Sequence, residues 1–419
     1  MSNNNVDYGC YSAAKLHHST HIRYLSTNCI RFFCRNKTNR TDYQAISVSQ
    51  NHHCIMAIIP AKVHTDKKNE QKQAKKVGTE EESLYLCTMK VVIYKDVDTL
   101  PTLPQGAYFH SRELMELCQR TPHHKPYMAV VTDDNEQVVA CLLAVERYRY
   151  SWMLPLLHRQ VRILGEGVYR EDVGNITSDA VKYSKNMLFS MMIDALTRKV
   201  CGRSLYIEVS NLTQKMFGYA PLRATGFFPV RWMSIHNSLH SKTPEERISP
   251  RQLERVTAAS HRGIQTHEVQ TADDFRNFSR LMRHHYWLKV RRFLPDDSFF
   301  RGMMETGHCK LLITTYKGKT VGCSVIVYSE GDAYLWYSAS RRKSYAALHP
   351  NAVTFWNTIR KAHQDGCQHI RFMDVGLPFR RNPYREFILS FGGKEVSTLR
   401  WFRINIKWIN KLASWLWRE

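Results

Sequence analysis

The chain has 419 residues, of which 43% are hydrophobic and 23% are charged, and this composition is that of a globular protein with one large or two ordinary domains. The 60 Lys and Arg residues exceed the 37 Asp and Glu residues, which gives a formal net charge of +23 at pH 7. Such a charge favours a polyanionic partner, such as RNA, nucleotide phosphates or an anionic membrane surface, and does not choose among them.

Cysteine and hydrophobic patterns exclude several classes of protein. The 11 cysteines form no Cys-x-x-Cys pair and show no His spacing suited to zinc. We therefore expect no metal site, a reducing compartment, and cysteines that serve as small buried hydrophobic residues. The apolar run at residues 54–59 is too short to span a bilayer and too far into the chain for a signal peptide. These patterns predict a cytoplasmic protein.

Residues 1–88 differ in character from the rest of the chain. They are rich in Asn, His, Ser and Thr, show no sustained hydrophobic period, and include a charged spacer at residues 67–82. Met89 then begins a plausible strand. We expect residues 1–88 to be a disordered or non-native extension and Met89 to be the natural start, which N-terminal analysis of the protein from its native source would test.

The first predicted domain, residues 89–235, alternates helices and strands. Its expected elements are a helix at 111–120, strands at 127–131 and 138–144, an extended piece at 150–154, a helix capped by Ser178 with Asp179 in its first turn and ending near Val200, and a strand at 205–209. A Gly226-Phe-Phe turn follows.

A polar linker at residues 236–262 precedes a second domain at residues 263–400. The expected elements there are a helix at 272–288, strands at 310–316 and 320–328 joined by a Lys317-Gly-Lys hairpin, a strand at 333–339, a helix at 351–365, a strand at 369–374 and a Phe391-Gly-Gly turn. This order repeats that of the first domain, which predicts an α/β fold with two similar domains.

The second domain resembles a known family. The residues that carry the resemblance are Trp336-Tyr-Ser-Ala-Ser, His349-Pro-Asn, Ala362-His-Gln-Asp-Gly, Phe372-Met-Asp and Tyr384-Arg-Glu-Phe-Ile-Leu-Ser-Phe-Gly-Gly. Together they resemble acyltransferases of the GNAT superfamily in the tandem, FemABX-like form, over residues 89–400. The resemblance implies two tandem GNAT-like domains, each a mixed, mainly antiparallel sheet flanked by helices, with donor and acceptor clefts at or near their junction.

The resemblance also implies the reaction class. Members of the family move an aminoacyl group from tRNA to an amine of a peptidoglycan precursor, or an acyl group from a coenzyme A thioester to an amine. The usual acyl-CoA fingerprint, Gln or Arg followed by x-x-Gly-x-Gly or Ala, is absent from the loop at residues 340–350. We expect no resident cofactor, and the donor stays open between acyl-CoA and aminoacyl-tRNA.

Two basic loops flank the helix at 351–365 and form the best phosphate-binding candidate. A helix N-terminus beside Arg and Lys side chains suits a phosphate-bearing donor. A solvated charged face is the alternative interpretation. The donor-binding candidates are Ser340, Arg341, Arg342, Lys343, Asn351, Arg380, Arg381, Tyr384 and Arg385.

Acyl transfer to an amine needs a neutral nucleophile, a polarised carbonyl and an acceptor for the released proton. The candidates for the base are Asp374 at a strand end, His349 beside Pro350, and Glu166, Glu171 and Asp172 in one acidic loop of the first domain. Tyr337 is a candidate hydrogen-bond donor to the leaving group or the oxyanion. Each has a structural alternative: an ion-pair partner for the carboxylates, a capping residue for His349 and a core position for Tyr337.

The tail, residues 401–419, alternates aromatic and aliphatic residues with basic ones. From Ile404 onward it fits an amphipathic helix with Trp408, Leu412 and Trp415 on the same stripe. Such a helix suits an anionic bilayer surface, which would make the protein peripheral at the inner face of the cell membrane and favour a lipid-linked acceptor. A terminal strand and helix that dock on the second domain are the alternative.

Two functional hypotheses follow from the sequence. The first is an N-acyltransferase or aminoacyltransferase that acts on an amine of a cell-envelope precursor or a lipid. The second is a non-catalytic protein of the same tandem fold that binds RNA or an anionic membrane surface through its positive charge. Salt dependence separates them, because non-specific binding to a polyanion weakens steeply as salt is added.

Overall fold

The computed structural model of the chain describes residues 22–25, 29–32, 43–46, 49–50, 53–54, 57–60, 89–148, 159–173, 177–178, 181–182, 184–287, 293–373, 375–379 and 381–417. The candidates Asp374 and Arg380 and the extended piece expected at 150–154 lie outside these residues. The chain divides into two compact units, Met1–Lys90 and Val91–Glu419.

The described residues of the first unit form short antiparallel strand pairs. These are β1 (Ile22–Leu25) with β2 (Cys29–Phe32), β3 (Tyr43–Ile46) with β6 (Ala57–Pro60), and β4 (Ser49–Gln50) with β5 (His53–Cys54). Most of residues 1–88 lie outside the described part of the chain, so the nature of this segment stays a prediction.

The second unit is built on one 13-stranded sheet, in the described part of the chain, with the order β16-β17-β18-β19-β20-β15-β21-β14-β10-β9-β8-β7 and with β11 paired to β9. The strands in the first half of the unit are β7 (Lys90–Tyr94), β8 (His124–Thr132), β9 (Val138–Tyr148), β10 (Arg159–Leu164), β11 (Val168–Tyr169), β14 (Tyr206–Ser210) and β15 (Phe228–Ser238). Those in the second half are β16 (Gln265–Glu268), β17 (Cys309–Tyr316), β18 (Lys319–Ser329), β19 (Asp332–Ser340), β20 (His369–Phe372) and β21 (Lys394–Ile404).

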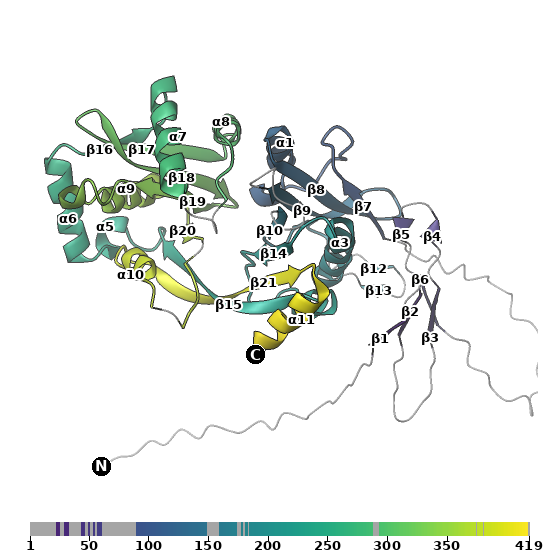
Figure 1. Ribbon diagram of the computed structural model, residues 1–419. Helices are drawn as coiled ribbons and strands as arrows, with labels where there is room; N and C mark the ends of the chain where they lie inside the picture. The colour runs from purple at the N-terminus through teal and green to yellow at the C-terminus, as the bar shows by residue number, and fades with distance from the viewer. Residues whose placement is uncertain are drawn as a thin grey trace, which may run out of the picture. The chain divides into compact units, whose positions relative to one another are not determined.

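Helices lie on this sheet in both halves (Figure 1). In the first half they are η1 (Tyr108–His110), α1 (Arg112–Arg120), α3 (Lys185–Val200) and α4 (Tyr219–Ala224). In the second half they are α5 (Pro244–Arg247), α6 (Pro250–His261), α7 (Ala272–Tyr286), α8 (Asp297–Glu305), η2 (Ala346–Leu348), α9 (Pro350–Gln364), α10 (Pro383–Leu389) and α11 (Lys407–Leu416). The region expected as a linker, residues 236–262, holds the end of β15 together with α5 and α6.

Two long strands connect the halves of the sheet. β15 comes from the first half of the unit and pairs with β20, with Ile235 opposite Phe372. β21 comes from the end of the chain and pairs with both β15 and β14, with Val209 opposite Trp401. Figure 1 shows these strands running between the two halves. The two halves of the unit therefore share one continuous sheet.

Each half contains one parallel strand pair within an otherwise antiparallel arrangement, which confirms the mixed, mainly antiparallel fold expected from the sequence. β10 pairs with β14 along residues 160–164. β19 pairs with β20 only from Asp332 to Leu335, although β19 itself continues to Ser340. β20 ends at Phe372, the partner of Leu335, and from there β19 continues to Ser340 without a β20 partner among the described residues. We refer to this end of the pairing as the point where the two strands separate.

Alternation along β18 explains how helices cover both faces of the sheet, because successive side chains of a strand point to opposite faces. Cys323 and Val325 belong to the apolar core that also includes residues of α7 and α8. Ser324 between them points the other way and its hydroxyl lies 2.8 Å from Oγ1 of Thr358 on α9. The sheet is thus packed between α7 on one face and α9 on the other.

One predicted helix boundary was wrong. The helix expected to begin after Ser178 begins at Lys185, because the side chain of Ser184 caps it by accepting a hydrogen bond from the backbone N–H of Met187. Thr177 and Ser178 instead form strand β12, which pairs with β13 (Val181–Lys182).

Cysteine burial follows the expectation from the sequence. Among the described cysteines, Cys118, Cys141, Cys309, Cys323 and Cys367 are buried and only Cys201 is exposed. In the described part of the chain, none of the helices has the length and apolar character needed to cross a membrane.

Candidate donor pocket

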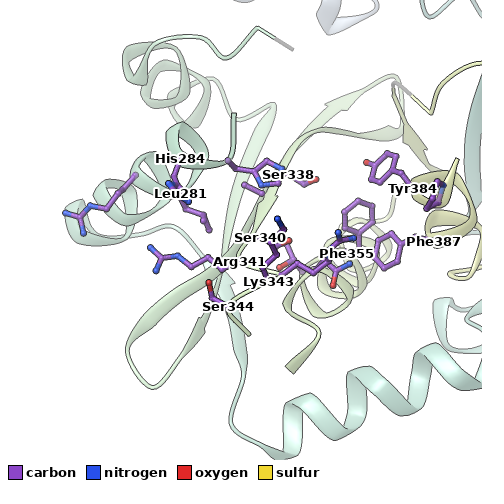
Figure 2. A pocket seen from close by; sticks show the side chains of 17 residues that line it. Leu281, His284, Ser338, Ser340, Arg341, Lys343, Ser344, Phe355, Tyr384 and Phe387 are labelled. Carbon is purple, nitrogen blue, oxygen red and sulfur yellow. The ribbon is translucent and has the colours of Figure 1, made fainter. Parts of the chain in front are cut away.

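An open pocket of about 1270 Å³ lies where β19 and β20 separate. Its lining comes from the end of β19, the loop after it, the start of α9, the end of α7 and the start of α10. Figure 2 shows Phe355, Tyr384 and Phe387 together on one side, with Leu281 and His284 of α7 on the other. The pocket is therefore assembled from segments that are distant in the sequence.

The described lining of the pocket is cationic. Arg280, Arg341, Arg342 and Lys343 all line it, and none of the described lining residues is Asp or Glu. The backbone N–H of Arg341 donates to the carbonyl of Val321 at 2.8 Å, which holds the basic loop against β18. Nε of Arg341 is buried and has no hydrogen-bond partner among the described residues. The pocket is thus suited to an anionic ligand.

An aromatic wall faces this cationic loop. The ring of Phe355 on α9 lies 5.1 Å from that of Phe387 and 6.1 Å from that of Tyr384, both on α10. An apolar wall opposite a cationic one can hold a ligand that has both a phosphate-bearing part and an apolar part.

The start of α9 adds a helix N-terminus to the pocket. Pro350 occupies the first turn, where its missing N–H is of no consequence, and Asn351 lines the pocket. Backbone N–H groups at a helix N-terminus favour anions. His349 caps this helix with a left-handed backbone, φ 43°, and is not among the lining residues. Burial, together with the nearby Arg255 and Arg262, lowers the pKa of His349, so its imidazole stays neutral at physiological pH.

Several sequence candidates for donor binding come together here. Those that line the pocket are Ser340, Arg341, Arg342, Lys343, Asn351 and Tyr384. Arg381 instead pairs with Glu386, with Nε and Oε1 3.1 Å apart, and Arg385 pairs with Glu395 at 3.2 Å. The Arg385–Glu395 pair links α10 to β21, and neither arginine is among the described lining residues.

The end of α7 belongs to the site, although the sequence pattern did not predict it. Arg280, Leu281, His284 and His285 line the pocket, because α7 packs across β18 and β19 and ends above the opening. The spacing of Arg280 and His284 by one helical turn is the only sequence signal for them, and it does not say which surface they face.

Tyr337 occupies a different place from the donor pocket. It lines a small cavity of about 40 Å³ with Arg147 and Arg162, and its hydroxyl donates to the carbonyl of Phe293 at 3.2 Å. Its ring packs against those of Tyr286 and Phe300 in the core shared by the two halves. This geometry gives Tyr337 a packing role, and a catalytic role for it stays a prediction.

The acidic candidates of the first half hold loops. Glu166 accepts hydrogen bonds from the backbone N–H groups of Thr213 at 2.9 Å and Gln214 at 3.2 Å. Asp172 accepts a hydrogen bond of 2.7 Å from Nε of Arg170. Neither is among the residues that line the donor pocket. A direct role for either in the reaction stays a prediction.

Comparisons with known proteins agree with this architecture. Residues 250–381 match the family described as acetyltransferase (GNAT) domain, which confirms the resemblance inferred from the sequence. None of the curated proteins matches the chain.

Similar solved structures have low sequence identity to the chain. A crystal structure of FemX is 12% identical, with a TM-score of 0.49 and coverage of 74% of this chain and 95% of that one. The C-terminal domain of a putative lysylphosphatidylglycerol synthetase from Agrobacterium fabrum is 9% identical, with a TM-score of 0.47 and coverage of 74% and 90%. A tandem GNAT protein from the clavulanic acid biosynthesis pathway is 13% identical, with a TM-score of 0.45 and coverage of 76% and 98%.

Proposed function

On the premise that residues 250–381 form a GNAT domain, we propose that the chain is an N-acyltransferase or aminoacyltransferase that acts on an amine of a cell-envelope precursor or a lipid. Its donor is a phosphate-bearing acyl compound, either acyl-CoA or aminoacyl-tRNA. The observation that carries the proposal is the pocket at the separated strands, where Arg341, Arg342 and Lys343 meet the N-terminus of α9 without a lining carboxylate among the described residues.

The donor phosphates are proposed to bind the basic loop. Arginine side chains and the backbone N–H groups at the start of a helix are both strong phosphate ligands. Because the usual glycine fingerprint is missing from this loop, its side chains would supply contacts that backbone amides supply elsewhere. The apolar part of the donor would lie along Phe355 and Phe387.

The separated part of β19 is proposed to orient the acyl carbonyl. Residues 336–340 of β19 have no partner on β20 among the described residues, so this strand edge faces the opening. A backbone N–H directed at the carbonyl oxygen would stabilise the negative charge that develops there during attack. No covalent intermediate with the protein is needed.

The chemical step then exchanges one bond of the acyl carbon for another. The amine nitrogen attacks the acyl carbon, and the bond to the sulfur of coenzyme A or to the ribose oxygen of tRNA breaks. The amine loses a proton, and the leaving thiolate or alkoxide takes one up. His284 lines the pocket and is a candidate carrier for this proton, because imidazole changes its charge nearest to neutral pH. Asp374 follows β20 in the sequence and is the second candidate, outside the described residues.

Direct assay of transfer tests the proposal. The full chain is incubated with acyl-CoA or aminoacyl-tRNA and with envelope precursors or lipid amines, and the products are identified by mass spectrometry. Replacing Arg341 and Arg342 with Ala should weaken donor binding about tenfold or more, because charge-assisted hydrogen bonds to phosphate are lost.

The matched control replaces two surface arginines outside the pocket. Arg276 pairs with Asp273 and Arg198 with Asp194, so R198A/R276A removes the same charge without touching the lining. It should leave donor binding nearly unchanged. Equal loss in both double variants, with binding that falls steeply with salt and no transfer product, would favour the non-catalytic polyanion-binding alternative.

A further inference from the structure

Helix α11 presents a large apolar face to solvent. Trp408, Leu412, Trp415 and Leu416 are 68%, 50%, 63% and 64% exposed. Their spacing places them on one side of a helix. None of the described residues covers this face, and such an exposed cluster marks a binding surface.

The outward orientation of this face is held by the fold. On the inner side of α11, Nδ2 of Asn410 donates to the carbonyl of Gly226 at 2.9 Å, and its Oδ1 accepts from the backbone N–H of Ile404 at 2.8 Å. Ile409 and Ala413 are half-buried against the sheet side. The helix is therefore docked through Asn410, Ile409 and Ala413, and Trp408 and Trp415 point away.

A second exposed aromatic residue lies near the end of α11. Phe379 is 69% exposed, and its ring lies 6.2 Å from that of Trp417 at the end of α11. Phe379 belongs to the loop between β20 and α10, and α10 supplies Tyr384 and Phe387 to the donor pocket. We call Trp408, Leu412, Trp415 and Leu416 the aromatic edge. The contact between Phe379 and Trp417 brings the end of α11 close to the loop that precedes α10.

Two basic residues lie beside the aromatic edge. Lys407 and Lys411 of α11 are exposed, next in sequence to Trp408 and Leu412. α11 itself contains no Asp or Glu. A symmetric contact between two copies through this face would enclose these lysines without a carboxylate of α11 to pair with them. An anionic bilayer, in contrast, supplies the opposite charge together with an apolar layer.

We propose that the aromatic edge binds the interface of an anionic lipid bilayer. Tryptophan is enriched where hydrocarbon meets lipid headgroups, and Lys on the polar rim adds attraction to anionic lipids. α11 has 10 residues, which suits a helix that lies in the interface. Lipid binding by this surface does not require acyl transfer. Together with the proposed function, membrane binding would bring the donor pocket close to acceptors carried by the membrane.

Vesicle flotation of the full chain tests this surface. The probes are vesicles of phosphatidylcholine alone and of phosphatidylcholine with phosphatidylglycerol at a ratio of roughly 7:3, which mimics an anionic leaflet. We expect binding to the mixed vesicles and weak binding to the neutral ones. W408A/W415A should lower the partition coefficient at least about tenfold, since both apolar anchors are lost.

Two matched controls distinguish the aromatic edge and its lysines from an exposed tryptophan and a lysine pair elsewhere on the protein. Trp287 at the end of α7 is 76% exposed, and W287A should leave vesicle binding unchanged. K407E/K411E should reduce binding to mixed vesicles roughly fivefold per lysine. K317E/K319E, in the hairpin between β17 and β18, should have a much smaller effect.

Several outcomes would overturn the proposal. They are the absence of binding by the unmodified chain, equal binding by W408A/W415A with an unchanged melting temperature, and equal losses in the edge and control variants. A dimer that forms with increasing concentration and is abolished by W408A/W415A, without vesicle binding, would assign the edge to a second copy of the chain. Because flotation needs no donor, its failure is distinct from a failure of acyl transfer.

Discussion

The carboxylate of Asp332 on β19 accepts a hydrogen bond of 2.6 Å from Nε of Arg371 on β20. Nδ1 of His369, also on β20, lies 3.0 Å from the other oxygen of the same carboxylate. These contacts lie at the start of the stretch along which β19 and β20 pair, which runs from Asp332 to Leu335. Asp332 therefore holds the two strands together at the end of that stretch farther from the donor pocket.

Replacing Asp332 with Asn tests this role. The variant keeps the shape of the side chain but weakens its hydrogen bonds to Arg371 and His369, and should cost about 1–3 kcal/mol in the free energy of unfolding. It should also weaken donor binding, because the angle between β19 and β20 is no longer held. Chemical denaturation and donor titration measure the two effects.

Asp365 provides a matched control for this variant. Its carboxylate contacts Lys310 at 2.9 Å and Lys361 at 3.0 Å, in the same half of the unit but outside the pocket lining. D365N should lower stability by a similar amount and leave donor affinity unchanged. If both variants lose donor affinity equally, the effect of Asp332 is one of general stability.

Gly322 on β18 lies against the helix that borders the pocket. A Cβ atom at this position would lie 2.1 Å from Oγ1 of Thr354 on α9 and 3.4 Å from the carbonyl of Pro350. G322A should therefore displace the start of α9, at a cost of about 1–3 kcal/mol in unfolding free energy, and should weaken donor binding. Unfolding curves and donor titration provide the measurement.

Thr354 offers the rescue experiment. G322A/T354A removes the hydroxyl that the new Cβ would meet and should recover part of the lost stability relative to G322A. T354A alone should be mildly destabilising, because Thr354 also donates to the carbonyl of Pro350 at 2.8 Å. Simple additivity of the two single changes would show that the predicted clash does not exist.

Two buried histidines predict loss of stability in mild acid. Burial lowers the pKa of His110 to about 3 and that of His124 to about 4, from an ordinary value of 6.5. The two ring nitrogens of His110 lie 3.1 Å from the backbone nitrogens of Leu143 and Gly167. A neutral imidazole can accept a hydrogen bond from one of these N–H groups, and an imidazolium can accept from neither. The folded protein therefore resists protonation that the unfolded chain accepts below pH 6.5.

The sign of the pH dependence follows from this difference. Below pH 6.5 the unfolded chain binds more protons, so stability falls as the pH falls, by about 1.4 kcal/mol per pH unit for each histidine. The loss ends near pH 4 for His124 and near pH 3 for His110. Chemical unfolding between pH 7.5 and about 5 should show it. H110N should reduce the slope, because it removes one of the groups that resist protonation, whereas H261Q, at an exposed position, should not change it.

Glu208 on β14 holds two arginines from neighbouring strands. Its Oε1 lies 3.3 Å from Nη1 of Arg400 on β21 and 3.5 Å from Nε of Arg162 on β10. E208Q would leave both guanidinium groups in a largely buried place without this charge, at a cost of about 3–5 kcal/mol in unfolding free energy. E116Q, which breaks an exposed pair with Arg120, should cost less than about 0.5 kcal/mol. Similar losses in both variants would contradict the role of Glu208.

Local patterns predicted much of the fold because they depend on neighbours in the sequence. α1 covers residues 112–120, close to the helix expected at 111–120, and the Lys317-Gly-Lys turn joins β17 to β18, as expected. The alternation of β19 and the amphipathic period of α9 follow the same local rules. The start of α3 was misplaced because Ser178 and Ser184 are both plausible caps, and the sequence pattern does not rank them.

The site could be predicted only in part. The basic loop of Arg341, Arg342 and Lys343 was identified because it precedes a helix, and a helix start favours anions wherever it lies. His284 and Arg280 were missed, since their place over the pocket depends on the packing of α7 across the sheet. Tyr337 was selected for its place on β19, but the strand turns this side chain to the core shared by the two halves.

By itself, the sequence determined the repeated order of helices and strands, the excess of positive charge, the basic loop and the amphipathic tail, because each depends on residues that are close together in the chain. Only the tertiary structure decided that β15 and β21 join the two halves into one sheet, and that β19 extends past its last β20 partner toward the basic loop. It also decided which side of α11 faces solvent. These features depend on contacts between residues far apart in the sequence, and no local pattern specifies such pairings.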